Sequence, residues 1–477
     1  MKNILTIMLI TLLLWSCKTD KKDNSTVVVN ETEPKEILAP ISDDVLESAI
    51  IYEANIRQYS PEGSFDEFTK DIPDLKKLGV KIIWLMPVFP ISETKRKATG
   101  GADSKFASDF PENEQAKYLG SYYAVSDFTK INPEFGTIED FRELVSTAHD
   151  NGMYVILDWV PNHTGWDHTW LKTNPEYYTQ NDKSEVVHPE GTDWTDVADL
   201  NYDNKSMRKE MVEDMSYWIT EEGVDGFRCD VAGSVPFDFW KETIPQLRKQ
   251  KDIFMLAEAW EPELLKGDLF DMAYAWDGHH LMNALAKGEK NLSDFDAYST
   301  KIFKDYQTDD ILMNFVTNHD ENSWNGTIKE RMGDASELMT VFSYMQKGMP
   351  LIYTGQEYDL AHRLKFFEKD SIPKTKGKTW GLLEKLAVLK TTNTALHGGK
   401  DAAAFVNLKS DNKHILDMVR KKGKQKVRFI GNFSNEVQTM KNTTSGSFKD
   451  YMTNSEVELK TGDELTFQPW EYKILTD

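Results

Sequence analysis

The stretch V-D-G-F-R-C-D, residues Val224–Asp230, is a short apolar segment that ends in an arginine and an aspartate. Its composition predicts a buried strand with charged residues at its end. Burying a carboxylate is costly unless a partner holds it, and Arg228 lies two residues before Asp230 on the same face of a strand. The pair is either catalytic or a structural ion pair. The residues elsewhere in the chain distinguish these two interpretations.

Short apolar runs of this kind alternate with longer amphipathic stretches along most of the chain. The expected strands are 49–56, 80–85, 153–157, 224–227, 253–257, 270–275, 311–317 and 349–353. The amphipathic stretches include 65–78, 138–151, 205–222 and 335–346. This alternation is typical of repeated βα units and a parallel sheet. Eight such units predict a closed (β/α)₈ barrel, in which active-site groups lie at the carboxyl ends of the strands.

Two regions interrupt the βα pattern. Residues 165–204 form a long insertion rich in Trp, Tyr, Asp and His, and 92–121 form a polar one. From about residue 396 the helical stretches stop and short alternating runs follow at 414–420, 426–433 and 464–474. We therefore expect an α/β fold: a TIM barrel at 46–395 with a small inserted subdomain after the third strand, and a C-terminal all-β sandwich domain at 396–477.

The N-terminus has the composition of a targeting segment. Lys2 precedes an apolar run at 4–14, which predicts a signal peptide at 1–16 and is shorter than the ~20 residues of a transmembrane helix. Ser16 and Cys17 resemble a bacterial lipoprotein processing site, which implies acylation of Cys17. Residues 17–45 would then be a lipidated N-terminus and a disordered tether. We expect an exported protein that a lipid holds on a bacterial membrane, at the outer membrane or cell surface.

The net charge limits the class of ligand. With a formal charge of −22, the chain is unsuited to bind nucleic acid or an anionic membrane surface by electrostatics. Its 13 Trp and 18 Tyr residues suit a neutral polar ligand that stacks on rings, as sugars do. No organic cofactor is expected.

Charged or imidazole side chains follow several of the expected strands. They are Asp158 and His163 after the third, Arg228 and Asp230 after the fourth, Glu258 after the fifth, and His319 and Asp320 after the seventh. Acids crowded into one pocket do not all ionise freely, so one retains its proton while another, paired to arginine, stays anionic. Retaining glycoside hydrolysis needs such a pair.

These considerations give each acid a role. Asp230, held anionic by Arg228, is the expected nucleophile, and Glu258, on an apolar strand, is the expected proton donor. Asp320 would bind hydroxyls of the distorted sugar ring, to which His163 and His319 would donate hydrogen bonds. Each of these histidines alone is more often structural. The alternatives for two of the acids are a structural Glu258 at the barrel rim and an Asp158 that only braces the barrel mouth. A metal-dependent hydrolase is disfavoured, because the adjacent His279 and His280 would point to opposite sides of an extended segment.

Several motifs, in order along the chain, resemble those of the α-amylase superfamily. They are G-V-K-I-I-W-L-M-P (79–87), D-W-V-P-N-H (158–163), V-A-D-L-N (197–201), G-F-R-C-D (226–230), A-E-A-W (257–260), N-H-D (318–320) and G-M-P-L-I-Y-T-G-Q-E (348–357). Any one of them is a weak signal, whereas the ordered set is specific. The resemblance covers nearly the whole chain from about residue 48.

The resemblance implies the same three roles: Asp230 as nucleophile, Glu258 as proton donor and Asp320 as transition-state stabiliser. It also implies a set of substrate-binding residues: Tyr123, Asp158, His163, Arg228, Trp260 and His319. Tyr123 would be the ring that stacks on the sugar, and the adjacent Tyr122 is the alternative. Asn162 and Asp199 match the ligands of a structural calcium ion.

One departure affects the expected substrate. Many α-amylases follow the nucleophile with A-x-K-H, whereas V-A-G-S (231–234) stands here, so the Lys and His that help to bind the leaving group and calcium are absent. We expect a retaining hydrolase of α-1,4 bonds in starch, glycogen or maltooligosaccharides. The alternatives are a neopullulanase- or cyclomaltodextrinase-like hydrolase, an α-glucan transglycosylase and, outside the enzymes, a glucan-binding lipoprotein without catalysis.

Overall fold

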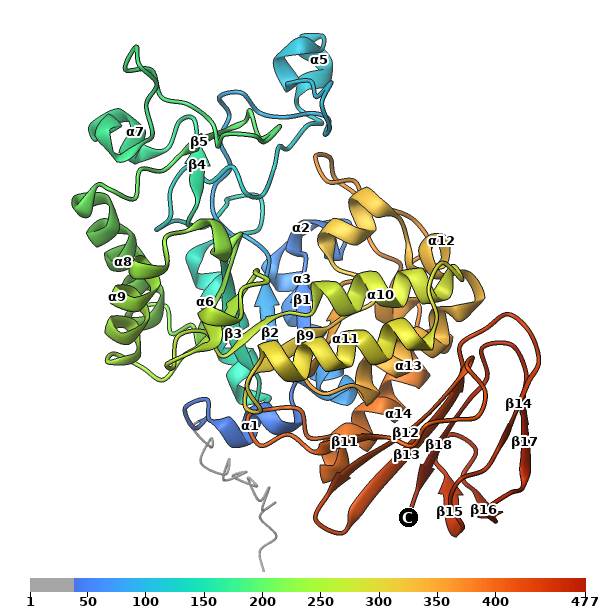
Figure 1. The fold of residues 1–477 in the computed structure, drawn as a ribbon. Coiled ribbons are helices and arrows are strands. Elements are labelled where there is room, and N and C mark those ends of the chain that lie inside the picture. Colours follow the sequence, from blue (N-terminus) through green and yellow to red (C-terminus); the bar gives the residue numbers. More distant parts are fainter. Residues whose placement is uncertain (1–37) are drawn as a thin grey trace, which may run out of the picture. The chain divides into compact units, whose positions relative to one another are not determined.

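The computed structural model describes residues 38–477 of the chain. Within this part, eight parallel strands close a barrel in the order β1-β10-β9-β8-β7-β6-β3-β2, with helices around it (Figure 1). The strands are β1 (Ile50–Ala54), β2 (Val80–Leu85), β3 (Tyr154–Trp159), β6 (Gly226–Cys229), β7 (Phe254–Ala257), β8 (Met272–Tyr274), β9 (Ile311–Asn314) and β10 (Met349–Tyr353). The predicted (β/α)₈ barrel is confirmed.

Alternate residues of the barrel strands belong to different cores. Ile51, Trp84 and Ile156 belong to a cluster that fills the barrel interior. Their neighbours Tyr52 and Leu157 belong to the larger cluster between the barrel and its helices. The period of two in strand side chains produces this division, and it explains why the strands are apolar on both faces.

The helices of the barrel domain differ widely in length. The longer ones are α6 (Ile138–Asp150), α8 (Lys205–Thr220), α9 (Phe237–Arg248), α10 (Trp276–Ala286), α11 (Leu292–Asp305), α13 (Ser336–Met345) and α14 (Lys378–Thr392). The shorter ones are α1 (Asp43–Ser48), α2 (Ile56–Tyr59), α3 (Phe65–Thr69), α4 (Ile72–Leu75), α5 (Glu112–Gln115), α7 (Thr169–Thr173) and α12 (Ile328–Met332). The predicted helical stretch 65–78 is divided into α3, α4 and a 3₁₀ turn, because Pro73 lacks the N–H that a continuous helix requires.

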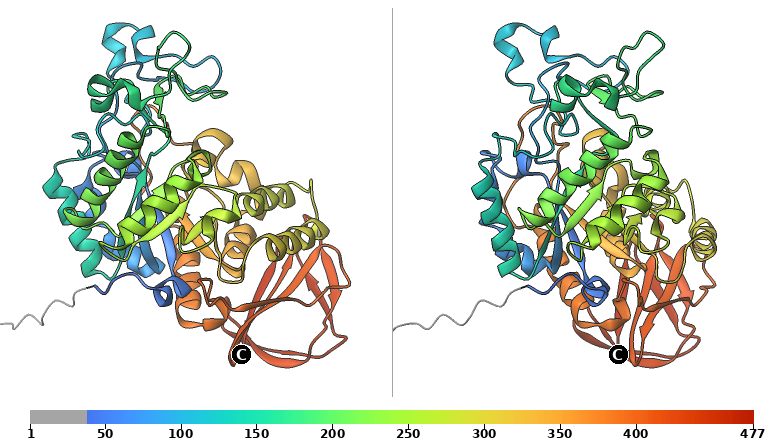
Figure 2. Two further views of the ribbon diagram at one scale, coloured as in Figure 1. Left: turned by 60° about the vertical axis from the view of Figure 1, so that its left-hand side comes forward. Right: turned by 90° about the vertical axis from the view of Figure 1, so that its left-hand side faces the viewer.

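The two predicted insertions lie at the same end of the barrel, where Figure 2 shows them in two further views. In the insertion after β3, β4 (His163–Gly165) pairs with β5 (Val197–Asp199), and α7 lies between these strands in the sequence. The insertion after β2 carries α5. Backbone N–H groups of Glu93 and Thr94 donate to Asp167, so the two insertions are joined to each other.

The C-terminal part is built of antiparallel strands, which confirms the predicted all-β domain. Within the described residues these strands form a six-stranded sheet, β11-β12-β13-β18-β15-β16, and a pair, β14-β17. They are β11 (Ala404–Asn407), β12 (Ile415–Lys422), β13 (Gln425–Asn432), β14 (Gln438–Lys441), β15 (Gly446–Asp450), β16 (Ser455–Leu459), β17 (Glu464–Phe467) and β18 (Tyr472–Thr476). The run predicted at 464–474 is divided between β17 and β18, because Trp470 adopts a left-handed φ of 59° after Pro469.

The C-terminal sheet packs against α13 of the barrel domain. The Phe342 ring lies 5.1 Å from that of Phe433 and 6.0 Å from that of Phe429. Arg420, which is fully buried, donates to the carbonyls of Met345 and His397. A buried guanidinium that binds carbonyls of the barrel domain and of the segment leading into the C-terminal sheet fixes the orientation of the sheet on the barrel.

The predicted signal peptide 1–16, the lipidation site Cys17 and most of the tether lie outside the described residues. From residue 38 the chain follows the barrel, since Tyr154 donates to the Ala39 carbonyl, and α1 begins at Asp43 within the predicted tether. Across residues 38–477, no helix combines the length and the apolar character needed to cross a bilayer.

We expect Gly226→Ala to destabilise the barrel at the start of β6. Gly226 has a φ of 145°, and a Cβ there would lie 1.9 Å from the Phe254 carbonyl oxygen of the neighbouring β7. Strain and overlap with backbone should cost roughly 3 kcal/mol or more of the free energy of unfolding, measured in urea.

Gly381→Ala is the matched control for this substitution. Gly381 lies inside α14, and a Cβ added there would have nothing within 4 Å of it. Since alanine has the higher helix propensity, this variant should be neutral or more stable by up to about 1 kcal/mol. Equal unfolding curves for the two variants would contradict the close approach of β6 and β7.

Candidate active site

A cleft of about 380 Å³ lies at the carboxyl ends of the barrel strands. Three acids line it: Asp230 follows β6, Glu258 follows β7 and Asp320 lies beyond β9. The remaining lining residues come mainly from the two insertions and from the segments after β9 and β10: Lys97, Gly100, Gly101, Ser121, Tyr123, His163, Asp193, Trp194, Asp196, Val197, Val231, His319, Trp324, Phe366 and Phe367. The structure thus brings the three predicted catalytic acids together.

Arg228 lies beneath the cleft floor, fully buried, and holds three carboxylates. Its Nη1 donates to Asp158 Oδ1 at 2.7 Å and to Asp230 Oδ1 at 2.9 Å. Its Nη2 lies 2.9 Å from Glu258 Oε2, as an ion pair without an aligned hydrogen bond. The sequence predicted a pair between Arg228 and Asp230, whereas the structure shares the guanidinium among three acids.

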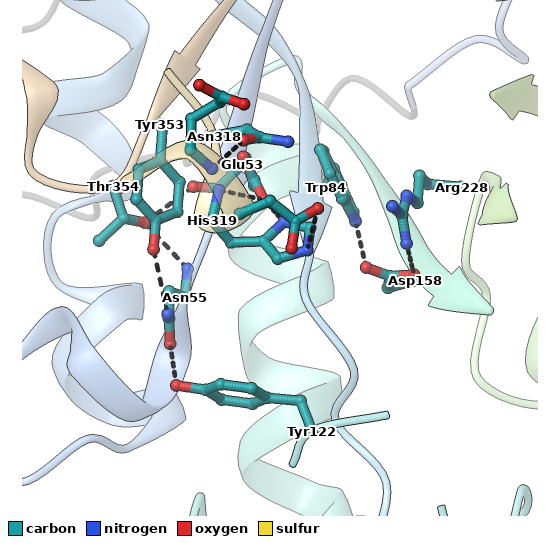
Figure 3. Close-up of polar contacts among 12 residues, drawn as sticks. Glu53, Asn55, Trp84, Tyr122, Asp158, Arg228, Asn318, His319, Tyr353 and Thr354 are labelled. Atoms are coloured by element: carbon teal, nitrogen blue, oxygen red, sulfur yellow. Dashed lines mark hydrogen bonds and ion pairs between the residues drawn. The ribbon is translucent and has the colours of Figure 1, made fainter. Parts of the chain in front are cut away.

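Asp158 is also fully buried. Its Oδ2 accepts a hydrogen bond from Trp84 Nε1 at 3.2 Å (Figure 3). The same oxygen accepts from the Tyr123 hydroxyl at 3.0 Å. Asp158 and Arg228 were predicted to contact substrate, but neither lines the cleft. With no exposed surface, they position the groups above them instead.

His319 links the cleft to the barrel interior. Its Nδ1 lies 2.5 Å from Glu53 Oε1, and its Nε2 lies 2.8 Å from the Tyr123 hydroxyl and 3.4 Å from Asp320 Oδ2. Burial alone would lower the pKa of His319, but the carboxylates of Asp320 and Glu53 raise it to about 9. A protonated ring donates through both nitrogens, so the Tyr123 hydroxyl accepts from His319 and donates to Asp158.

The structure distinguishes the two adjacent tyrosines. Tyr123 lines the cleft and its ring is stacked on that of His319, with centroids 5.5 Å apart. Tyr122 is buried instead, under the guanidinium of Arg57, and donates to Asn55. Tyr123 is therefore the ring that a bound sugar can meet.

The strained backbone after Asp230 provides a hydrogen bond to Glu258. Val231 has a φ of 37°, which is rare for a β-branched residue. This conformation directs the Val231 N–H to Glu258 Oε2 at 2.8 Å. The turn therefore fixes the carboxyl groups of Asp230 and Glu258 relative to each other, as strained segments at functional sites do.

The acids around Arg228 and His319 outnumber these two cations. Burial raises the pKa of Asp230, Glu258 and Asp320 above their ordinary values, and Arg228 or His319 opposes the shift in each case. Burial likewise raises the pKa of Asp158 to about 7. Burial and crowding thus disfavour ionisation of all four acids at once, as the sequence predicted for such a pocket.

His163 and Trp260 differ in their relation to the cleft. His163 lines it, and burial lowers the pKa of its imidazole to about 4, so the ring is neutral at pH 7. Trp260 is not among the lining residues, contrary to its predicted contact. It is 52% exposed and stacks on Trp276 with centroids 5.7 Å apart. It follows Glu258 by two residues, and Ala259 between them is buried.

The predicted calcium ligands lie next to each other in the insertion after β3. The Asn162 carbonyl accepts from Leu200 N, and Asp199 is opposite His163 in the β4–β5 pair. In residues 38–477, no group of three or more His, Cys, Asp or Glu side chains is arranged to hold a metal ion. Calcium also takes amide and backbone carbonyl oxygens, so the site at Asn162 and Asp199 stays a prediction.

Several residues of the site were missed by the sequence interpretation. Glu53 contacts His319, and its signal was an acid inside the apolar strand I-I-Y-E-A, the same signal that identified Asp158. Trp84 and Tyr274, which contact Asp158 and Arg228, resemble ordinary core aromatics in the sequence. The cleft residues Trp324, in the short π-helix Glu321–Asn325, and Phe366, in a loop, lie where no periodicity marks them.

Comparison with known proteins agrees with this geometry. The family model for the α-amylase catalytic domain matches residues 30–428. The chain belongs to this family. A model for the β-galactosidase C-terminal domain matches residues 418–477.

The α-amylase family relatives are distant and mostly longer. An α-amylase of Dictyoglomus thermophilum is 27% identical over 352 residues, which are 65% of this chain and 64% of that protein. A 4-α-glucanotransferase of Thermotoga neapolitana is 29% identical over 62% of this chain and 67% of its own length. The chain spans 44% of an α-amylase of Haloarcula japonica and 56% of a cyclomaltodextrin glucanotransferase of a Bacillus species.

Solved α-amylase structures cover nearly the same length as this chain. The crystal structure described as a noncanonic maltogenic α-amylase of Thermotoga neapolitana has a TM-score of 0.78 at 26% identity, covering 91% of this chain and 99% of that one. An α-amylase of Lactobacillus plantarum has a TM-score of 0.77 at 26% identity, covering 91% and 100%. The likeness therefore includes both the barrel and the C-terminal sheets.

We expect His319→Gln to flatten the pH dependence of stability above neutral pH. The pKa of His319 is about 9 in the folded protein and about 6.5 in an unfolded chain. Its stabilisation is therefore complete below pH 6.5 and is lost as the pH rises to 9. The wild-type free energy of unfolding should fall by up to about 1.4 kcal/mol per pH unit more steeply than that of the variant.

The exposed His280 provides a control for urea titrations at pH 6, 7.5 and 9. His280→Gln removes an imidazole that lies outside the cluster of Glu53, Asp320 and His319. It should keep the wild-type slope. Identical slopes for all three proteins would contradict the charged state assigned to His319.

Proposed function

We propose that this chain is a retaining glycoside hydrolase that cleaves α-1,4-glucosidic bonds of starch, glycogen or maltooligosaccharides. The observation that carries the proposal is the set Asp230, Glu258 and Asp320, which follow three barrel strands and line one cleft. Membership of the α-amylase family and the similarity to amylases and glucanotransferases support the substrate class. The aromatic rings of Tyr123 and Trp194 in the cleft suit the apolar faces of sugars.

In the first step, Asp230 attacks the anomeric carbon while Glu258 protonates the glycosidic oxygen. The C–O bond to the leaving sugar breaks, its electron pair takes the proton of Glu258, and an ester forms between the sugar and Asp230. Arg228 donates to Asp230 Oδ1 and so keeps the attacking carboxylate oriented. Asp320 accepts hydrogen bonds from ring hydroxyls.

In the second step, water replaces the leaving sugar. Glu258, now ionised, removes a proton from water, the resulting hydroxyl attacks the anomeric carbon, and Asp230 leaves as a carboxylate. The product keeps the original anomeric configuration because two displacements occur. The neutral His163 supplies a hydrogen-bond donor to sugar hydroxyls throughout. Both N–H groups of the charged His319 are engaged by Glu53 and Tyr123, so His319 holds the Tyr123 ring in the cleft.

The contacts of the two acids differ in a way that fits these roles. Asp230 accepts an aligned hydrogen bond from Arg228, which favours its ionised form. The contact of Arg228 with Glu258 lacks this alignment, and the charge of Asp230 raises the pKa of Glu258 further. These contacts favour the ionised form of Asp230 and the protonated form of Glu258.

We expect Asp230→Asn to abolish turnover without unfolding the protein. The amide is isosteric but cannot form the ester, so kcat on maltoheptaose should fall by about 10⁴-fold or more. The urea unfolding midpoint should remain close to that of the wild type. An Asp230→Asn protein with substantial activity would overturn the assignment of the nucleophile.

Glu258→Gln separates the proton donor from the nucleophile. This variant should lose about 10²–10⁴-fold on maltoheptaose but far less on maltosyl fluoride, whose leaving group needs no proton. Slow turnover should then accumulate a sugar ester, and mass spectrometry of peptides should locate it on Asp230. An ester on another residue, or equal losses on both substrates, would contradict the two roles.

Transglycosylation is a second candidate, favoured by the similarity to the 4-α-glucanotransferase. In that reaction a sugar hydroxyl replaces water in the second step. Product analysis with maltoheptaose and excess glucose as acceptor distinguishes the two. Products longer than the donor would assign the chain to transfer, and reducing-end release alone would assign it to hydrolysis.

We also propose that the protein is exported and anchored through Cys17. The support is the sequence alone: an apolar run at 4–14 followed by Ser16 and Cys17. In a bacterial host with lipoprotein processing, wild type should incorporate radiolabelled palmitate and sediment with membranes. Cys17→Ser should lose both the label and the membrane association while retaining activity, and unchanged fractionation of this variant would contradict the anchor.

A further inference from the structure

We propose that the loop 96–107 ends the cleft on the side of the sugar that Asp230 attacks, so that the enzyme acts from the non-reducing ends of α-glucans and releases short products. This inference rests on the proposed function and adds to it the place of attack. Three features of the loop carry it: its internal structure, its contacts on each side, and its position relative to Glu258.

The loop 96–107 is an ordered hairpin. Ala98 N donates to the Lys105 carbonyl at 2.8 Å, and Ala107 N donates to the Arg96 carbonyl at 2.7 Å. Its tip turns at Gly101, whose carbonyl accepts from Ser104 N at 3.0 Å. Ala98 and Ala107 pack with Tyr118 in a small apolar cluster of their own. These contacts make the hairpin a fixed wall.

On one side the loop is attached to the insertion after β3. Lys97 is 4% exposed, and its Nζ donates to the Asp193 carbonyl at 2.5 Å and lies 3.6 Å from Asp196 Oδ1. All three residues line the cleft. A buried ammonium held in this way is costly to displace, so the loop stays attached to that insertion.

On the other side the loop meets aromatic residues from the segments after β9 and β10. A Cβ at Gly100 would lie 2.7 Å from Trp324 Cζ3 and 3.6 Å from Phe367 Cε2, so the Gly100 backbone packs closely on the Trp324 ring and faces that of Phe367. Leu119 N also donates to the Phe367 carbonyl at 2.7 Å. The Trp324 ring packs on Phe366 with centroids 5.0 Å apart. The loop and these rings thus form a continuous barrier across the cleft.

The order of the strands places this barrier opposite Glu258. In the closed barrel, β1 is four strands from β7 in either direction, and β2 and β10 flank β1. The barrier comes from the segments after β2, β9 and β10, whereas Glu258 follows β7. Since a general acid must reach the leaving oxygen, the leaving sugar lies on the β7 side, where Trp260 is exposed.

The attacked sugar and those before it therefore lie toward the barrier. In an α-1,4-glucan these are the sugars on the non-reducing side. A long chain that continued in that direction would overlap Gly100 and the Trp324 ring. Only a chain whose non-reducing end lies inside the cleft can then place its scissile bond between Asp230 and Glu258.

The test compares two nitrophenyl maltoheptaosides, one with a free non-reducing end and one with that end blocked by an ethylidene group. We expect the purified wild-type enzyme to cleave the free substrate and to cleave the blocked one on the order of 100-fold more slowly. Equal rates on both would overturn the barrier while leaving the hydrolase assignment intact. If the enzyme cleaved neither nitrophenyl substrate and also failed to cleave maltoheptaose, the proposed function would be overturned, and this inference with it.

Two variants open the barrier by different means. Trp324→Ala removes the ring that Gly100 touches, and deletion of 101–104 removes the hairpin tip. Each should raise the ratio of blocked to free cleavage by about tenfold and lengthen the products from amylose. Phe303→Ala, at a 62% exposed ring on α11 outside the cleft, is the control and should keep the wild-type ratio. A wild-type ratio in both folded barrier variants would contradict the role of the loop.

Discussion

The active site depends on one guanidinium buried inside a closed barrel. Arg228 is fully buried and contacts Asp158, Asp230 and Glu258, while burial raises the pKa of all three acids. Removing the cation would leave several carboxyls without their partner in a site of low dielectric, which is far more costly than the net value of any one pair. The same arrangement fixes the two reacting carboxyls on one rigid group.

The fold and the three acids could be predicted because their signals are local. A charged residue at the end of an apolar strand is unusual and is visible in the sequence, as at Arg228 and Asp230. The same signal occurs at Asp158, Glu258 and Asp320. The carboxyl ends of parallel strands meet at one end of a barrel, so the acids had to converge. The alternation of strands and helices predicted the barrel. The predicted strands 49–56 and 311–317 were longer than β1 and β9, which end at Ala54 and Asn314.

What the sequence did not reveal is the position of a side chain relative to the cleft. Asp158 and Arg228 were placed in contact with substrate, but the pleat turns them under the floor, where the hydroxyl of Tyr123 joins them to His319. Trp260 was placed in the cleft and lies beside it. The contact of Gly100 with Trp324 joins a loop to a short π-helix more than two hundred positions away, and no periodicity reports such a contact.

The residues on the two sides of the cleft differ, and in the proposed mechanism each side controls a different step. On the non-reducing side, the hairpin and the Trp324 ring limit which chains enter. On the leaving side, V-A-G-S (231–234) brings no long side chain, because Gly233 faces Glu261 so closely that a Cβ would lie 2.6 Å from its Oε2. In the proposed mechanism, water or a second sugar enters from that side and displaces Asp230 from the ester. Partition between hydrolysis and transfer in this mechanism is set by which of the two reaches the ester on Asp230 first.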